Sequence, residues 1–312
     1  MKKRIKRVRA ILSIFVMALF MLSGLVVPFA DTSADTNTDK LGFSMSPLKE
    51  NVILSPGETY KSSFTIHNPA TSEKDFAYEV SVTPFFVDEN YRNVFEKEGA
   101  YNEIVDWITI DSPKNGTLTP NEKVEINFTI NVPKNAPGGG QYAAISVTSA
   151  NPTNEGDKSA ILERAAIAHT IFAEVTGNTI HSGEVKDATV PSFVTSGNIY
   201  GESTIVNTGN VHGKATYTLT VNSLFSNEEI YSNSESPASH DVLPGRAYYS
   251  KTEWDKTPSV GMFNVKYVVD FDGVVTEVSK MVIICPIWLM VVLILVVVGI
   301  IVGIVVLIRK RK

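Results

Sequence analysis

Apolar and polar residues alternate with a period of two between Leu41 and Val282, in short runs rich in Val, Ile, Thr, Tyr and Phe. Pro, Gly and Asn interrupt these runs, and no helical stripe competes with the alternation. The pattern is typical of half-buried β-strands. The strands that it predicts include residues 59–67, 76–82, 122–131, 141–149, 166–175, 203–206, 214–221, 247–254, 262–270 and 274–282.

An internal duplication relates the two halves of this region. Residues 65–68 and 78–82 match residues 204–207 and 217–221 at an offset of 139. Further matches follow in the same order at smaller offsets: 118–122 with 242–246 at 124, and 137–142 with 258–263 at 121. Because the order is kept and the offset only shrinks, we expect two copies of one sandwich, with shorter loops in the second.

The repeated landmarks are structural in character. Asn68-Pro69 and residues 207–210 are turn residues that end a strand. Asp272-Gly273 predicts a hairpin between the last two strands. After each turn, one face of the next strand is expected to fill the core, with Tyr78, Val80 and Val82 in the first copy and Tyr217, Leu219 and Val221 in the second.

The two ends of the chain indicate its location. Residues 1–30 combine six basic residues with an apolar run from Ala10 to Val27, which predicts a secretory signal peptide. Cleavage after Ala30, cleavage after Ala34 and an uncleaved anchor all remain open. Residues 287–308 are 22 apolar residues, enough to span about 33 Å as a helix. The basic tail 309–312 then places the C-terminus in the cytoplasm and the rest of the chain outside the cell membrane.

These observations predict an all-β fold, namely two tandem immunoglobulin-like β-sandwiches followed by a single C-terminal transmembrane helix. No sortase motif precedes the span, so we expect the protein to stay in the membrane. The predicted parts are a signal peptide (1–30), a disordered polar linker (31–40), sandwich 1 (41–177), sandwich 2 (178–282), the transmembrane helix (287–308) and a cytoplasmic basic tail (309–312).

Charge and cysteine content exclude several classes of protein. The region between the two apolar ends holds 18 basic and 33 acidic residues, so its surface repels phosphate, and no nucleic-acid partner is expected. The single cysteine, Cys285, rules out an intrachain disulfide, a CxxC redox pair and a multi-cysteine zinc site.

Motifs that could support catalysis or cofactor binding have simpler structural interpretations. Ser46-Pro47-Leu48-Lys49 has the spacing of serine acyl enzymes, but Pro47 opposes the helix that this motif needs. Gly138-Gly139-Gly140 leads into a strand rather than a phosphate-binding helix. Asp270 and Asp272 could bind calcium, but a hairpin needs only the Asp-Gly pair.

The histidines and tryptophans give no stronger signal. His67, His169, His181, His212 and His240 lack the spacing of a metal site. Trp107 and Trp254 are interpreted as core residues, and Trp288 lies at the membrane interface. We therefore expect no enzyme activity, no cofactor and no metal, and assign no catalytic, cofactor-binding or metal residues; the binding residues are unknown.

One set of segments comprises residues 54–58, 64–69, 206–212 and 242–245 and the apolar span with its basic tail. Together these segments resemble the WxL-interacting proteins of Gram-positive bacteria, and the resemblance runs from about Leu41 to Lys312. The resemblance implies two immunoglobulin-like domains before a membrane anchor. It also implies noncovalent binding of peptidoglycan, of a WxL-type surface protein, or of both.

We accordingly expect a membrane-anchored adaptor at the cell surface. The alternative is an extracytoplasmic assembly chaperone that captures a client by β-strand addition, since sandwiches offer unpaired strand edges. A hydrolase hidden in an unrecognised fold is a third possibility, which a carboxylate pair in a cleft would support. The partner, the oligomeric state and any dependence on calcium stay open.

Overall fold

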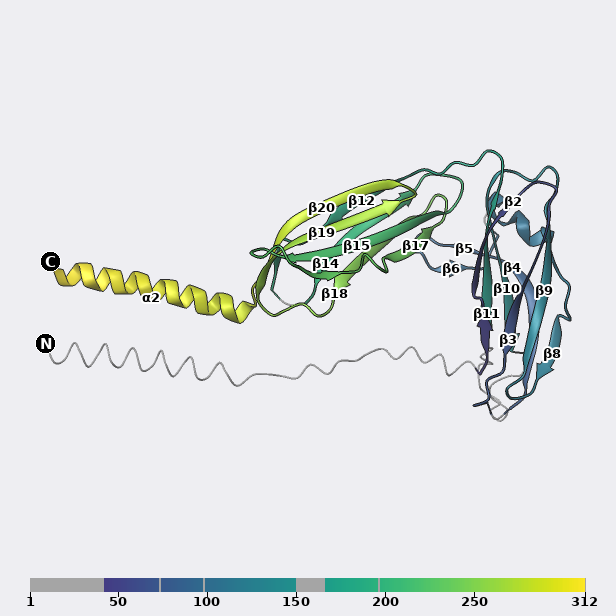
Figure 1. Cartoon of the computed structure of the whole chain (residues 1–312), viewed down its shortest axis with the longest axis horizontal. Coiled ribbons are helices and arrows are strands. Elements are labelled where there is room, and N and C mark those ends of the chain that lie inside the picture. The colour runs from purple at the N-terminus through teal and green to yellow at the C-terminus, as the bar shows by residue number, and fades with distance from the viewer. Residues whose placement is uncertain (1–41, 73, 98, 150–165, 196, 312) are drawn as a thin grey trace. The chain divides into compact units, whose positions relative to one another are not determined.

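The computed structural model describes residues 42–72, 74–97, 99–149, 166–195 and 197–311 (Figure 1). The predicted signal peptide and polar linker lie outside these residues.

The first sandwich consists of two sheets and short accessory elements. One sheet has the order β1 (Ser44–Ser46), β3 (Thr59–His67), β9 (Lys123–Asn131), β7 (Ile108–Ile110). The other has the order β2 (Lys49–Leu54), β11 (Ala166–Val175), β10 (Gly139–Ser149), β4 (Phe76–Pro84), β8 (Asn115–Leu118). A two-stranded ribbon, β5 (Phe86–Val87) with β6 (Asn93–Val94), and the 3-10 segment η3 (Gly99–Trp107) complete it.

The core of the first sandwich lies between these sheets. Phe64, Ile66, Ile126 and Phe128 of one sheet pack in the same buried cluster as Tyr78, Val80, Ile145 and Ile171 of the other. The alternation along the strands explains the arrangement, because every second side chain of a strand points to the same face. Two apolar faces then meet and leave the polar faces outside.

The second sandwich also has two sheets. One has the order β12 (Gly183–Thr189), β14 (Ile199–Asn207), β18 (Ala247–Trp254). The other has the order β13 (Phe193–Val194), β20 (Val274–Ile284), β19 (Gly261–Phe271), β15 (Gly213–Ser223), β16 (Glu229–Ser232), and β17 (Ala238–Val242) also pairs with β15. Tyr217, Leu219, Val265 and Tyr267 are among the buried residues of its core.

The strand pairings repeat between the sandwiches. β3 pairs with β9 as β14 pairs with β18, and β4 pairs with β10 as β15 pairs with β19. In each sandwich a short early strand also runs parallel to the last strand, β2 along β11 and β13 along β20. The duplication inferred from the sequence is therefore present in the topology.

A buried asparagine marks the same point in each copy. The Asn68 Nδ2 donates to Leu118 O at 2.9 Å, and the Asn207 Nδ2 donates to Val242 O at 2.7 Å. The two acceptors are the first residues of the sequence match at offset 124. Each asparagine side chain thus links the end of its strand to the turn that precedes β9 or β18. This is a role beyond that of an ordinary turn residue.

The sequence match at offset 121 differs by one residue from the alignment that the strand pairing gives. Val147 pairs with Val80 and Tyr267 pairs with Leu219, which aligns β10 with β19 at an offset of 120 rather than 121. The match at 121 aligned Tyr142, which lies outside the core of its sandwich, with Phe263, which lies inside its own. A shift of one residue exchanges the two faces of a strand, so the inward-facing residues decide the register.

Contacts also link the two sandwiches. The Tyr91 Oη donates to Asp241 O at 2.6 Å and accepts from Leu243 N at 2.9 Å, and the Lys49 ammonium pairs with the Asp241 carboxylate. Leu243 packs in one buried cluster with Phe86 and Tyr142.

The chain ends in the helix α2 (Ile287–Arg311), which follows β20 after only two residues (Figure 1). Residues 287–310 have a mean hydropathy of 3.7 and are long and apolar enough to cross a membrane. The chain is thus all-β, with two tandem immunoglobulin-like β-sandwiches followed by one apolar helix, as the sequence predicts.

Candidate functional site

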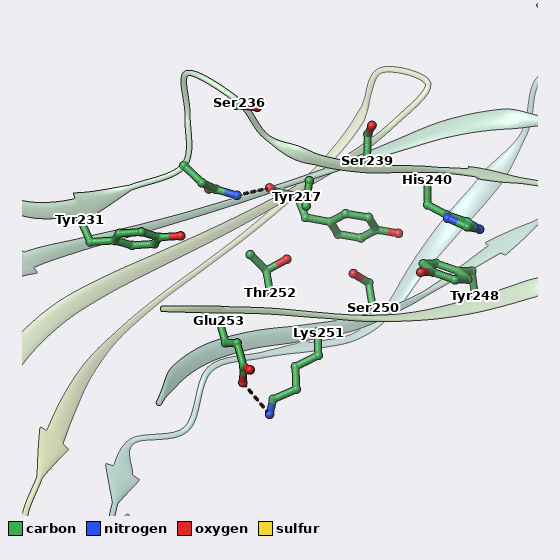
Figure 2. A pocket seen from close by; sticks show the side chains of 12 residues that line it. Tyr217, Tyr231, Ser236, Ser239, His240, Tyr248, Ser250, Lys251, Thr252 and Glu253 are labelled. Atoms are coloured by element: carbon green, nitrogen blue, oxygen red, sulfur yellow. Dashed lines mark hydrogen bonds and ion pairs between the residues drawn. The ribbon is translucent and has the colours of Figure 1, made fainter. Parts of the chain in front are cut away.

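The candidate site is a groove of about 470 Å³ along one side of the second sandwich. One wall is β18, and the other is formed by β15, β16 and β17 of the opposite sheet (Figure 2). On one side β18 pairs with β14, and within the described residues no strand pairs with its other side. The groove therefore runs beside a strand edge whose outward backbone groups have no ladder partner.

Hydroxyl groups form the inner face of the groove. Ser250 and Thr252 of β18 point into the sandwich, towards Tyr217 of β15 (Figure 2). The Tyr217 ring is only 1% exposed and Thr252 only 7% exposed. The Tyr217 Oη and Thr252 Oγ1 are buried, and within the described part of the chain neither has a partner in good hydrogen-bond geometry. The Ser250 hydroxyl approaches Tyr217, and the Thr252 hydroxyl approaches Tyr267, closely enough to oppose part of the rise in the pKa of each phenol that burial causes. Buried hydroxyls are normally paired, so these two are suited to receive a polar group of a ligand.

The neighbouring polar pair is satisfied and shows the contrast. Behind Ser250, the Ser203 hydroxyl lies 3.0 Å from the Tyr267 Oη, and both residues are fully buried. Burial raises the pKa of Tyr217 and of Tyr267, so both phenols stay protonated at any physiological pH.

Aromatic rings form the ends of the groove. His240 of β17 stacks flat on Tyr248 of β18, with ring centroids 3.8 Å apart, and Tyr91 approaches Tyr248 edge-on. At the other end, Tyr231 stacks on Trp254 at 5.5 Å. Burial lowers the pKa of His240, so its imidazole is neutral near pH 7. One face of Tyr248 and one face of Tyr231 are thus covered by other rings of the protein.

The outer face of β18 is polar and charged. The Lys251 Nζ lies 3.0 Å from the Glu253 carboxylate, and the Tyr249 Oη donates to Glu202 at 2.7 Å. This hydrogen bond to a carboxylate raises the pKa of Tyr249 to about 12. These polar side chains keep the outer face of β18 hydrated. The face of β18 that points into the groove carries the hydroxyls of Ser250 and Thr252.

The motifs singled out in the sequence lie elsewhere. Ser46 and Lys49 are on strands of different sheets rather than one helix, and Lys49 pairs with Asp241. Gly139 is the first residue of β10, so the glycine run leads into a strand, as the sequence predicts. In the predicted hairpin, Asp270 accepts from Gly273 N at 2.8 Å and Asp272 accepts from Lys214 N at 2.9 Å, so both carboxylates bind backbone amides.

The histidines are dispersed, and within the described residues no group of His, Cys, Asp and Glu could hold a metal ion. His169 is buried and lies 3.2 Å from Glu50, His181 lies 3.2 Å from Glu174, and His212 lies 3.4 Å from the Tyr142 hydroxyl. His67 is on β3, and only His240 borders the groove.

The remaining singled-out residues are a cysteine and three tryptophans. Trp107 and Trp254 lie in the two cores, which confirms their interpretation as core residues. Trp288 is exposed in the first turn of α2, and Cys285 is a half-buried free thiol.

The groove residues were not identified from the sequence. Ser and Thr are common in strands, and neither Ser250 nor Thr252 stands out alone. The alignment at offset 124 contained the signal: continued to β18, it matches Ile126 with Ser250 and Phe128 with Thr252.

No protein-family model and no curated protein matches the chain. Among solved structures, it is similar to the class 5 fimbriae chaperone CfaA, with 11% identity over 78% of this chain and 100% of that one, and a TM-score of 0.37. The E. coli chaperone DraB shows 10% identity over 77% and 96% of the two chains, with a TM-score of 0.33. A PapD-like domain of human CEP192 shows 16% identity over 49% and 93%, with a TM-score of 0.30. Likenesses this distant carry no argument about what the chain does.

Proposed function

We propose that this chain is a membrane-anchored binding protein whose second sandwich captures an extended segment of a partner protein by strand addition along β18. The observation that carries the proposal is the coincidence of an unpaired strand edge with a groove that holds two buried hydroxyls lacking a hydrogen bond of good geometry. Strand addition supplies main-chain hydrogen bonds for affinity and side-chain pockets for specificity. The groove provides such a pocket directly beside the edge.

The groove fits a peptide better than a glycan. Protein sites commonly hold sugars against the open face of an aromatic ring. Here His240 covers one face of Tyr248, and Trp254 covers one face of Tyr231. A peptide needs no open ring face, because the strand edge supplies its hydrogen bonds. We therefore propose that a WxL-type surface protein or another extracytoplasmic client binds this site through its own main chain.

The same features favour binding over catalysis. His240 is the one histidine of the groove, and it lies flat against Tyr248. In the described residues its ring makes no hydrogen bond to Ser239 or Ser250, so neither serine is activated by a base.

Membrane anchoring is part of the proposal. The 25 residues of α2 span about 37 Å at 1.5 Å per residue, more than the hydrocarbon core of a bilayer. The basic residues at its C-terminal end favour a cytoplasmic tail, with both sandwiches outside the membrane.

Hydrogen exchange of the full chain in lipid nanodiscs tests the site. Surface proteins extracted from the producing cells are added, and the amides of β18 are compared with and without them. We expect slower exchange along β18, because an added strand pairs its outward amides. If a partner binds but the amides of β18 exchange at an unchanged rate, strand addition is contradicted.

Two variants sharpen this experiment. Ser250→Ile with Thr252→Phe gives the groove the larger apolar side chains of the first sandwich and should abolish the protection. Val275→Phe adds a ring at an exposed position of β20, outside the groove, and should leave the protection intact. The amount of protein that sediments with stripped peptidoglycan sacculi is measured for the wild type and for the double variant. Equal sedimentation of both would favour glycan binding elsewhere on the chain.

A further inference from the structure

One end of the second sandwich exposes large apolar side chains. Phe225 follows β15 and is 85% exposed, the highest value of any large apolar residue described. Val260 precedes β19, Met262 is the second residue of that strand, and Phe193 begins β13; all three are exposed. Exposed apolar residues gathered at one end of a domain mark an interaction surface.

Strand pairing places these residues at the end from which α2 departs. Met262 and Phe193 both pair with Ile283, the second-last residue of β20. Leu224 N donates to Met262 O at 3.3 Å, so Phe225 is next to this end as well. We refer to Phe193, Phe225, Val260 and Met262 as the apolar tip.

The link between the sandwich and the helix is short. Cys285 and Pro286 alone separate β20 from α2, and Leu289 N already donates to Pro286 O at 3.0 Å. Two extended residues reach only about 7 Å. Leu289 and Met290 of the first helical turn line the same apolar depression as Phe225 and Val260. The apolar tip is therefore held within a few ångströms of the point where α2 would enter a bilayer.

From this geometry we infer that the apolar tip inserts into the lipid interface, so that the second sandwich rests on the membrane surface. The inference depends on the membrane anchoring proposed above. Aromatic and aliphatic side chains are favoured at the boundary between headgroups and acyl chains. The charged residues of the adjacent turns, Glu228, Asp255 and Lys256, have both signs, so insertion depends on apolar contact and does not require anionic lipid.

Depth-dependent quenching in vesicles tests the inference on the full chain. In a Cys285→Ser background, an environment-sensitive fluorophore is attached to Phe225→Cys, Val275→Cys or Ile294→Cys. The vesicles consist of zwitterionic phosphatidylcholine with brominated acyl chains. Val275 is the matched control, because it is apolar and 60% exposed but lies at the opposite end of β20. Ile294 reports whether α2 itself is inserted.

Each result decides one question. Severalfold stronger quenching at residue 225 than at residue 275, with residue 294 also quenched, supports the inference. Quenching at residue 294 with equal, weak quenching at residues 225 and 275 overturns the inference and leaves the anchoring intact. Absence of quenching at residue 294 overturns the anchoring, and with it the docking of the apolar tip.

Discussion

Strands β9 and β18 occupy the same place in two copies of one fold, yet they differ in their neighbouring strands and in their inward-facing residues. β9 lies between β3 and β7, and its inward residues Ile126, Phe128 and Ile130 are completely buried. β18 pairs only with β14 among the described strands, and the residues matching Ile126 and Phe128 are Ser250 and Thr252. The second copy thus lacks the neighbouring strand and has hydroxyls at two of the three inward positions, whereas the third, Ile130, is matched by the buried Trp254.

A third replacement belongs to the same region. Phe64 in the first sandwich corresponds to Ser203 in the second, at the offset of 139. Tyr267 takes the place of Val147 and pairs with that serine. The two replacements compensate each other, because the larger Tyr267 fills the space left by the smaller Ser203 and supplies a hydroxyl to pair with it. A duplicated domain can become a binding site by exchanging core packing for polar groups at one edge, at some cost in stability.

The largest expected effect comes from making the first sandwich resemble the second. Phe128→Thr removes a ring at 0% exposure and adds a hydroxyl to an apolar core. We expect a loss of about 3–5 kcal/mol in the free energy of unfolding. Urea unfolding of the full chain in detergent, followed by hydrogen exchange of β9, measures it. A loss as small as that of Phe128→Leu would show that the first core tolerates the exchange as the second does.

The buried asparagines should be equivalent in the two copies. Asn68→Ala and Asn207→Ala each leave buried carbonyl groups without their amide donor. We expect each variant to lose about 2 kcal/mol of stability. Thermal unfolding of both variants tests the equivalence. A large loss for one and none for the other contradicts a shared structural role.

The unpaired hydroxyl of Thr252 should respond in the opposite direction from a paired one. Thr252→Val keeps the shape and removes a buried group without a partner, so we expect a gain of about 1 kcal/mol together with weaker partner binding. Ser203→Ala breaks the bond to Tyr267 and should cost about 1 kcal/mol. Unfolding midpoints in urea give both signs. Destabilisation by Thr252→Val would mean that its hydroxyl is already satisfied.

The smallest effect is a pH dependence of stability just below neutral pH, which His240 and His212 of the second sandwich supply. Burial lowers the pKa of His240 and of His212 below the ordinary value of 6.5. The unfolded chain therefore binds more protons than the folded chain between the folded pKa and 6.5, and stability falls as the pH drops through that range. His240→Phe keeps a ring on Tyr248 and should reduce the slope of stability against pH, with His212 supplying the remainder. An unchanged slope in urea titrations from pH 7 to 5 argues against a contribution from His240.

Period-two alternation predicted most of the long strands, but it gave only residues 203–206 of β14 and did not include β12. Residues 59–67 and 247–254 were predicted with the bounds that β3 and β18 have. Short strands such as β1 and β7 escaped, because three residues carry too little alternation to be recognised. β2 escaped because its three polar residues precede its three apolar ones instead of alternating with them.

The site escaped for a different reason. Whether Thr252 is satisfied depends on Tyr217 and Ser250, which only the packed sheets bring to it. An unpaired strand edge is likewise a property of what lies beside β18, not of its own residues. The absence of β7's counterpart could have been read from the shorter interval between the matched segments, which falls from an offset of 139 to 124 across this region.

The two-residue link between β20 and α2 also has a mechanical meaning. β20 pairs with β19 over eleven residues, and α2 continues from its last one. If α2 is anchored in the bilayer and the second sandwich holds a partner, as proposed, a partner pulled away from the cell would load β20 along its own axis. The hydrogen bonds between β19 and β20 run across that axis, so they would be sheared together rather than opened one after another. In the proposed arrangement, the second sandwich would transmit tension from a bound partner to the membrane anchor.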